Sequence, residues 1–256
     1  MRRKSLPFHF TNVHGQKLSG ILDMPEGEPI VYGVFAPCFT CTKESHAAHK
    51  ICRTLADNNI AMLRFDMTGI GESEGDFAET NFSTRVKDIT AACHALAAEH
   101  QPPKLLIGHS ISGTAALLAV KQLPQIQVLA TLGSPRDPSY IINKFKRDKQ
   151  ITLKGDMAEL IVAGRKILVR KTFVDDMLSH DVAAATAEYA RKLFIFHAPH
   201  DDIVNFENAR IIDERATCDK ELLPLSEAAS HLLEQGTEDA SLIADAIRNW
   251  FEMHAA

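Results

Sequence analysis

The stretch that most constrains this sequence is residues 104–120, KLLIGHSISGTAALLAV. The short apolar run Leu105–Ile107 is typical of a buried strand, and the almost wholly apolar run Thr114–Val120 is typical of a buried helix. The tight turn between them places Ser110 at its tip, clear of the expected sheet. Free backbone N–H groups and the positive end of a helix dipole favour a developing anion there, so Ser110 is the first candidate for a functional side chain.

This strand–turn–helix unit has the form of a nucleophile elbow, whose usual pattern is G-x-S-x-G. Gly108 and Ser110 match that pattern. Ser112 stands in the fifth position, and Gly113 follows one residue late. An elbow needs small residues on both sides of its serine because the strand and helix backbones approach closely, and serine is small enough for that position. The unit therefore still predicts an exposed nucleophile.

Composition narrows the class of protein. The chain has 256 residues, of which 45% are apolar and 24% charged, as is ordinary for a globular protein with a sizeable core. Its net charge of −5 gives no general attraction for nucleic acid or an anionic membrane. No stretch is long enough to span a bilayer, and no secretory segment follows the basic start Met1–Lys4, so we expect a cytoplasmic protein.

The cysteines indicate the redox state. Their number is odd and their spacing is not that of a disulfide framework, which favours reduced thiols. They are Cys38, Cys41, Cys52, Cys93 and Cys218.

Strand-like and helix-like segments alternate along most of the chain. This alternation predicts the α/β class, with a doubly wound, mostly parallel eight-stranded sheet, helices on both faces and two antiparallel strands at one edge. The expected strands are Ser5–Val13, Lys17–Met24, Ile30–Ala36, Ile60–Phe65, Leu105–Ile107, Val128–Leu132, Leu193–Phe196 and Glu221–Leu225. The expected helices are Ser45–Asn58, Phe82–Glu99, Thr114–Val120, Phe206–Ala216 and Ser241–Met253.

The regular alternation lapses over residues 136–189. We therefore expect one α/β domain over residues 1–256, in which residues 136–189 form a lid at the carboxyl edge of the sheet, where ligands bind in open α/β folds. A hairpin is predicted near Gly164–Arg165 and a short helix near Asp175–His180. Between Tyr140 and Thr172, nine Lys or Arg residues accompany three Asp or Glu residues. This excess of positive charge favours a solvated surface; the alternative is a lid whose positive electrostatic field attracts anionic substrates.

A serine hydroxyl is a weak nucleophile unless an imidazole takes its proton and a carboxylate fixes the tautomer of that imidazole. In this class of fold the acid follows a late strand and the histidine follows the last one. Asp201 and Asp202 lie after the expected strand that ends at Phe196, and His231 lies after the final expected strand. Either aspartate satisfies this order, although Asp202 is also typical of a helix N-cap.

Other histidines lie near the same edge of the expected sheet, namely His109, His197 and His200. His109 is adjacent to Ser110 in the sequence, so its side chain should point away from the serine. We expect a supporting role for it at most.

An acyl-transfer site also needs two N–H donors for the oxyanion. The backbone N–H of Ile111 is one candidate, and the N–H of Phe39, in the loop after the third expected strand, is the other. The same loop begins a C-x2-C-x4-H-x2-H motif over residues 38–49, which raises the alternative of a zinc or dithiol site. Its spacing is compressed relative to zinc sites, whose ligand pairs lie roughly a dozen residues apart, so we expect no metal here.

Four segments resemble small bacterial esterases of the α/β-hydrolase family. Residues 37–43 resemble their H-G-F-T-G-S-K loop, with Pro37, Cys38 and Cys41 replacing His, Gly and Gly. Residues 63–73 resemble R-F-D-x-x-G-x-G-x-S. Residues 197–204 are similar to H-G-x-x-D-x-x-V, which implies that Asp201 is the catalytic acid, and residues 229–231 are similar to the catalytic-histidine segment. The C-F-T-C loop is most similar to hydrolase domains fused to an osmotically-inducible-type peroxidase domain.

These observations together predict an α/β-hydrolase fold and a serine hydrolase that cleaves a carboxylic ester or thioester of a small acyl molecule, with no metal or organic cofactor. Ser110 would attack, His231 would transfer the proton, Asp201 would orient His231, and the N–H groups of Phe39 and Ile111 would bind the oxyanion. The alternatives are a peptidase or acyltransferase with the same triad, a non-catalytic binding protein, or a redox or zinc protein. The sequence leaves the oligomeric state open.

Overall fold

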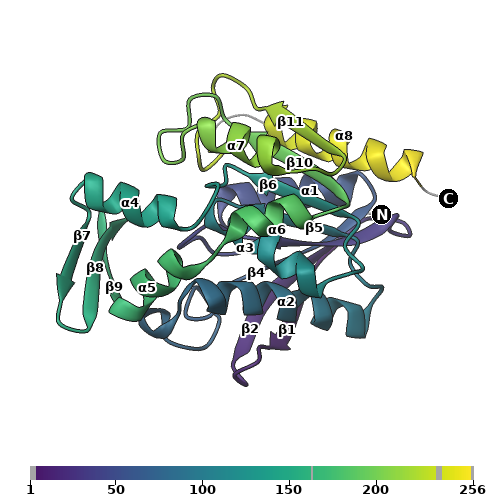
Figure 1. Cartoon of the computed structure of the whole chain (residues 1–256). Coiled ribbons are helices and arrows are strands. Elements are labelled where there is room, and N and C mark those ends of the chain that lie inside the picture. Colours follow the sequence, from purple (N-terminus) through teal and green to yellow (C-terminus); the bar gives the residue numbers. More distant parts are fainter. Residues whose placement is uncertain (1–3, 163, 235–237, 255–256) are drawn as a thin grey trace.

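The computed structural model describes residues 4–162, 164–234 and 238–254. Its centre is an eight-stranded sheet in the order β1-β2-β4-β3-β5-β6-β10-β11 (Figure 1). The strands are β1 (Lys4–Thr11), β2 (Lys17–Met24), β3 (Val31–Ala36), β4 (Ile60–Phe65), β5 (Leu105–His109), β6 (Val128–Leu132), β10 (Lys192–His197) and β11 (Lys220–Pro224). Strands β1 and β2 form an antiparallel hairpin, and β2 pairs antiparallel with β4. The other six strands of this sheet, β4, β3, β5, β6, β10 and β11, are parallel to one another. The predicted sheet and its antiparallel edge are confirmed.

Helices cover both faces of the sheet. On one face lie α1 (His46–Asp57) and α8 (Glu238–Met253), which contact each other. On the other face lie α2 (Phe82–Glu99), α3 (Ile111–Ala119), α6 (Val182–Glu188) and α7 (Glu207–Arg215), each in contact with the next. Short 3₁₀ turns, η1 (Phe77–Glu79) and η2 (Val120–Gln122), follow β4 and α3. Among the helices of the described ranges, none combines the length and apolarity needed to cross a bilayer.

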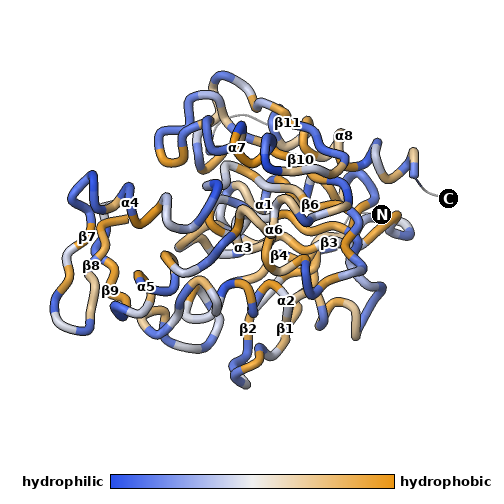
Figure 2. The backbone as a smooth tube through the Cα atoms, in the orientation of Figure 1, coloured by the Kyte–Doolittle hydropathy of each residue, from blue (hydrophilic) through white to orange (hydrophobic). Residues whose placement is uncertain are grey.

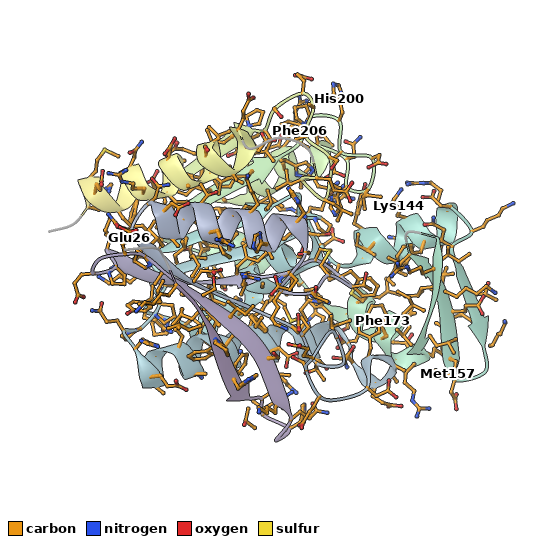
Figure 3. All side chains as sticks on the ribbon, turned by 180° about the vertical axis from the view of Figure 1, so that it is seen from behind. Glu26, Lys144, Met157, Phe173, His200 and Phe206 are labelled. Atoms are coloured by element: carbon orange, nitrogen blue, oxygen red, sulfur yellow. A yellow bond between two sulfur atoms is a disulfide. The ribbon has the colours of Figure 1, made fainter. Side chains whose placement is uncertain are left out.

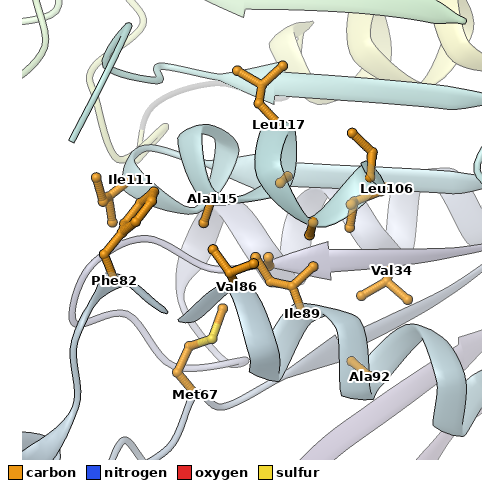
Figure 4. Packing of buried hydrophobic residues seen from close by; sticks show 14 of the residues in the cluster. Val34, Met67, Phe82, Val86, Ile89, Ala92, Leu106, Ile111, Ala115 and Leu117 are labelled. Atoms are coloured by element: carbon orange, nitrogen blue, oxygen red, sulfur yellow. The ribbon is translucent and has the colours of Figure 1, made fainter. Parts of the chain in front are cut away.

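The core consists of two apolar clusters, one on each face of the sheet. Successive residues of a strand point to opposite faces, so Val34 joins one cluster and Phe35 the other. The central strands are buried on both faces, which explains why their sequences are almost continuously apolar (Figure 2). On the face of α2, Val86 and Ile89 pack against the helix that contains Ala115 (Figure 4).

The segment between β6 and β10 contains α4 (Ser139–Arg147), β7 (Ile151–Lys154), β8 (Met157–Val162), β9 (Arg165–Arg170), α5 (Lys171–Ser179) and α6. Strands β7, β8 and β9 form a separate antiparallel sheet that stands beside the main sheet (Figure 1). The predicted hairpin is the β8–β9 pair, although Ala163 in its turn lies outside the described residues. The predicted short helix lies largely within α5.

Candidate active site

Ser110 occupies the turn between β5 and α3. Its φ is +56°, a left-handed value that is uncommon for a serine, and its N–H donates to the Leu132 carbonyl at 2.7 Å. This hydrogen bond ties the turn to the neighbouring strand β6. The strained conformation is the one expected of a nucleophile elbow, which lifts the hydroxyl above the sheet edge.

The elbow also shows why the glycine comes one residue late. A Cβ on Gly108 would lie 2.5 Å from the Cα of Gly113, and a Cβ on Gly113 would lie 1.9 Å from Ser134 Oγ. The close approach of strand and helix is therefore at Gly108 and Gly113. Ser112 enters this contact with its backbone carbonyl alone, and its buried hydroxyl donates to the Pro37 carbonyl.

The fold brings Ser110, His231 and Asp201 together from three distant loops. His231 Nε2 is 3.0 Å from Ser110 Oγ, and His231 Nδ1 is 2.6 Å from Asp201 Oδ2. All three side chains are buried, with between 5% and 7% of each residue exposed. The geometry matches a proton relay in which the carboxylate holds one imidazole nitrogen and the other nitrogen faces the hydroxyl.

The surroundings of Asp201 keep it ionised. Its Oδ1 accepts hydrogen bonds from the N–H groups of Ile203, at 2.9 Å, and Val204, at 2.7 Å. Burial by itself would raise the pKa of Asp201, but the hydrogen bond and charge of His231 outweigh it, and the pKa lies below its usual value. The carboxylate is thus available to stabilise an imidazolium at His231.

Asp202, the other candidate acid, is exposed. Helix α7, the next helix, begins at Glu207 with Phe206 in the N-cap position, so the expectation that Asp202 is a helix N-cap is wrong. The reason is that the turn after β10 is closed by Asp201, whose carboxylate accepts the two N–H groups that follow. Of the two aspartates, Asp201 is the one that reaches His231.

His109 and His197 bind backbone carbonyls near Ser110, Asp201 and His231. His109 points away from Ser110, and its Nε2 donates to the carbonyl of His231 at 2.8 Å. Burial lowers the pKa of His109 to about 3, so this ring stays neutral. His197 Nε2 donates to the Val204 carbonyl at 2.7 Å, closing the loop that contains Asp201. His200 is exposed, as Figure 3 shows.

The 37–41 loop follows β3 and lies beside Ser110. The structure joins Cys38 and Cys41 by a disulfide, with their Cα atoms 5.1 Å apart. The prediction of reduced thiols is therefore wrong for this pair, because the loop turns sharply enough to bring cysteines three positions apart within bonding geometry. The other three cysteines are free. Across the described residues, no group of three or more His, Cys, Asp or Glu side chains is arranged to hold a metal ion.

A pocket of about 230 Å³ opens beside Ser110. Its walls come from the 37–41 loop, from the elbow residue Ile111, and from the loops that contain Asp201 and His231. The segment between β6 and β10 supplies the remaining apolar wall, with Ile141, Phe145, Ile161 and Val162. None of these four wall residues was predicted from the sequence to bind substrate. Their apolar character within an otherwise basic segment was the available signal.

Most of the basic side chains in that segment are solvated and paired. Lys144 and Arg147 contact Asp148, and Lys154 and Lys166 contact Glu159. These pairs favour the interpretation of this region as a solvated face. Lys144 on α4 also borders the pocket. Phe173 on α5 packs against the 37–41 loop, with its ring centroid 5.6 Å from that of Phe39. Lys144 and Phe173 are labelled in Figure 3.

Buried charges hold the loops behind the site. Arg64 Nε is 2.7 Å from Asp23 Oδ2, and Lys43 Nζ is 2.7 Å from Asp66 Oδ2, with every one of these side chains almost fully enclosed. The pKa of Lys43 is raised: burial alone would lower it, but its bonds to Asp66 and Glu72 dominate. The segment over residues 63–73 therefore has a structural role close to the 37–41 loop.

Comparison with known proteins shows which hydrolases this chain resembles. Residues 41–154 match the family described as serine aminopeptidase, S33. The mitochondrial palmitoyl-protein thioesterase ABHD10 of Rattus norvegicus is 21% identical over 78% of this chain and 67% of its own length. Human ABHD10 is 24% identical over 66% of this chain, which spans only 55% of that relative.

Solved structures extend the likeness to the whole chain. The esterase domain of a Rhodothermus marinus protein is 32% identical, covers 98% of both chains and superposes with a TM-score of 0.76. Est1E from Butyrivibrio proteoclasticus, solved with ferulic acid, is 22% identical over 97% of this chain, with a TM-score of 0.78.

Two expectations from the sequence, the cytoplasmic location and the likeness to peroxidase-fused hydrolases, stay predictions after these comparisons. The curated relatives are named as mitochondrial, so the expected cytoplasmic location is not confirmed. The likeness to peroxidase-fused hydrolases is likewise not tested by these matches. The identity to the Rhodothermus marinus esterase domain over nearly all of both chains, with the shared fold, is decisive for the family. The chain belongs to the α/β-hydrolase family, as a hydrolase related to esterases and thioesterases.

Proposed function

We propose that this protein is a serine hydrolase that cleaves a carboxylic ester or thioester through an acyl-enzyme. The observation that carries this proposal is the continuous hydrogen-bond chain from Ser110 Oγ through His231 to the Asp201 carboxylate. Such a chain activates a hydroxyl that is otherwise a weak nucleophile.

In the first half-reaction, Ser110 Oγ attacks the acyl carbon while His231 Nε2 takes its proton. Asp201 holds Nδ1–H and stabilises the imidazolium that forms. His231 then returns the proton to the leaving alcohol or thiol, which departs and leaves an ester on Ser110. A water molecule repeats the sequence, with His231 again as the base, and releases the carboxylic acid. No step needs a metal or an organic cofactor.

The backbone N–H groups of Phe39 and Ile111 are the proposed oxyanion donors. Both residues line the pocket beside Ser110, and Ile111 is the first residue of α3. Its N–H is one of the donors that an α-helix leaves without an internal partner. Donors held in place before the reaction stabilise the tetrahedral intermediate without a cost for reorganisation.

The pocket favours an acyl group over a peptide with a free amino terminus. Its apolar wall, formed by Phe39, Phe145 and Ile161 among others, suits a hydrocarbon or aromatic acyl group. Apart from His231, the described lining residues include one charged side chain, Lys144, which would repel an ammonium group. Esters and thioesters, as in the names of the relatives, therefore fit better than the aminopeptidase substrates named for the family. We propose that residues 136–189 act as the lid of a single 1–256 domain.

Covalent labelling tests this function. A fluorophosphonate probe should label the wild-type protein at Ser110, and Ser110→Ala should abolish both labelling and hydrolysis of p-nitrophenyl esters. Ser179→Ala, at an exposed serine on α5, is the matched control and should behave as wild type. Parallel assays with an acyl thioester and an aminoacyl p-nitroanilide separate the substrate classes. Full turnover by folded Ser110→Ala would refute the proposal.

A further inference from the structure

Arg85, on α2, is a buried arginine whose partners are almost all carbonyl groups. Its Nη1 donates to the carbonyls of Pro37, at 3.2 Å, and Cys38, at 3.3 Å, and its Nη2 donates to the Phe39 carbonyl at 2.7 Å. Only 7% of the residue is exposed. Among the hydrogen bonds of the described residues, none joins it to a carboxylate, and burial lowers the pKa of Arg85 to about 10, although the charge of Asp88 acts in the opposite direction. Burying a cation without a hydrogen-bonded carboxylate costs free energy, and here the bonds that offset this cost all go to three successive carbonyls of one loop and to Ser112.

These contacts orient the peptide that supplies one proposed oxyanion donor. The Cys38 carbonyl and the Phe39 N–H belong to the same peptide group, which is trans. In a trans peptide the C=O and N–H point in opposite directions. By drawing the Cys38 carbonyl toward α2, Arg85 turns the Phe39 N–H away from α2. The positive charge on the carbonyl side also favours an anion on the N–H side of that peptide.

Ser112 connects this arrangement to the elbow. Its hydroxyl accepts a hydrogen bond from Arg85 Nη1 at 2.7 Å and donates to the Pro37 carbonyl. Ser112 is the residue after Ile111, whose N–H is the other proposed donor. A glycine in this position, as in the usual elbow pattern, has no hydroxyl and cannot make these bonds. The departure from the pattern thus adds a direct link between the two donors.

The helix that bears Arg85 is a rigid support. An Asn81–Thr84 capping box starts α2, and Phe82 and Val86, on either side of Arg85, are packed in the core (Figure 4). The position of the guanidinium is therefore determined by the core and not by the loop that it holds. A loop held from a packed helix keeps its carbonyls in one orientation.

We propose that Arg85 and Ser112 are positioning residues that set the geometry of the oxyanion hole by clamping the 37–41 loop. The inference rests on the proposed function, because it assigns a purpose to the Phe39 N–H. It differs from a purely structural role in one measurable way. A positioning role lowers kcat while KM is nearly unchanged, since the oxyanion forms only after the substrate has bound.

The test compares Arg85→Lys, Arg85→Met and Ser112→Ala with Arg191→Met. Arg191 is the matched control because it also donates to three backbone carbonyls, those of Val120, Leu123 and Pro124, but these lie outside the 37–41 loop. For each variant, kcat and KM are measured on a p-nitrophenyl ester, together with the affinity for an alkyl boronic acid, which mimics the tetrahedral intermediate. Unfolding is followed by circular dichroism.

For Arg85→Met we expect kcat to fall by about 100-fold, with KM changed by less than about threefold, since misplacing or losing one oxyanion donor has effects of this order. Boronate affinity should fall in parallel with kcat. Arg85→Lys, which keeps the charge but loses the planar fork, should be intermediate. Ser112→Ala removes a single oxygen and should lower kcat by about tenfold, so it keeps the inference testable if Arg85→Met fails to fold.

Wild-type kcat and boronate affinity in folded Arg85→Lys and Ser112→Ala would overturn the inference, as would an equal kcat loss in Arg191→Met. The proposed function fails in a different way, because the wild-type protein would then neither label at Ser110 nor hydrolyse the ester.

Discussion

Replacing Asp201 by Asn tests the proton relay most directly. Oδ1 of Asp201 accepts two backbone N–H groups, from Ile203 and Val204, so the amide oxygen of the Asn variant must occupy that position. The opposite orientation would set an NH₂ against two N–H donors and lose two hydrogen bonds, each worth about 1 kcal/mol. The NH₂ group therefore faces His231 Nδ1, at the 2.6 Å contact that Asp201 Oδ2 makes in the wild type.

An amide NH₂ at that position forces His231 into the tautomer that cannot act as a base toward Ser110. Nδ1 of His231 must then accept, its proton moves to Nε2, and Nε2 cannot take the proton of Ser110. We expect kcat to fall by about 10⁴-fold, as the corresponding change does in a serine protease, which is about 5 kcal/mol of transition-state stabilisation. The fold should survive because the shape of the side chain is retained.

The assay is kcat on a p-nitrophenyl ester, with the rate of fluorophosphonate labelling as a second measure. Asp202→Asn is the matched control, since Asp202 is the exposed neighbour and should retain wild-type kcat. If folded Asp201→Asn keeps kcat within about tenfold of wild type, the tautomer argument is wrong. An equal loss in Asp202→Asn would show that the acid has been assigned to the wrong aspartate.

Three further predictions concern the loop, the pocket and the acid. Reducing the Cys38–Cys41 disulfide should lower kcat only severalfold because Arg85 still holds the loop, and the kcat of Cys41→Ser should not change with dithiothreitol. Abolished turnover in Cys41→Ser together with an active Ser110→Ala would instead support a redox protein. Phe145→Ala shortens a side chain of the apolar wall and so enlarges the pocket. Among p-nitrophenyl esters from acetyl to decanoyl, the acyl length that gives the highest kcat/KM should therefore increase, and an unchanged optimum would exclude this wall from acyl binding. The pKa of Asp201 is lowered in the folded state, so its contribution to stability is complete above the unfolded-state pKa of about 4 and is lost as the pH falls through the lower folded-state pKa. In urea unfolding between about pH 5 and pH 2, the free energy of unfolding of Asp201→Asn should therefore fall less with pH than that of the wild type, and parallel curves would contradict this.

Much of the sheet could be predicted because its buried strands are short apolar runs that stand out in the sequence. Ile60–Phe65 and Val128–Leu132 were predicted to the residue: both are short apolar runs, and Asn59 and Gly133, each with a positive φ, bound them. Helix α2 was likewise predicted at both ends, from the helical spacing of its apolar residues and from the two prolines at 102 and 103 beyond it.

Other boundaries depended on contacts made far along the chain. Helix α3 begins at Ile111, three residues before its predicted start, because the strained turn at Ser110 is held by the Leu132 carbonyl of β6. Strand β7 was missed because its alternating run Ile151–Lys154 is only four residues long, and three of those residues are exposed. The helix containing Arg85 offered a signal that was not used: a charged residue on the same face as Phe82 and Ile89.

The sequence by itself determined the chain order of the eight strands of the main sheet, the elbow and the three residue types of the proposed relay, because periodicity and chain order are local properties. It left Asp201 and Asp202 equivalent until a family resemblance was added. Only the tertiary structure decided which carboxylate meets His231, that Cys38 and Cys41 are joined, and that Arg85 holds the 37–41 loop. The physical reason is that these contacts connect groups from separate elements, so their distances exist only once the sheet has closed and its helices have packed.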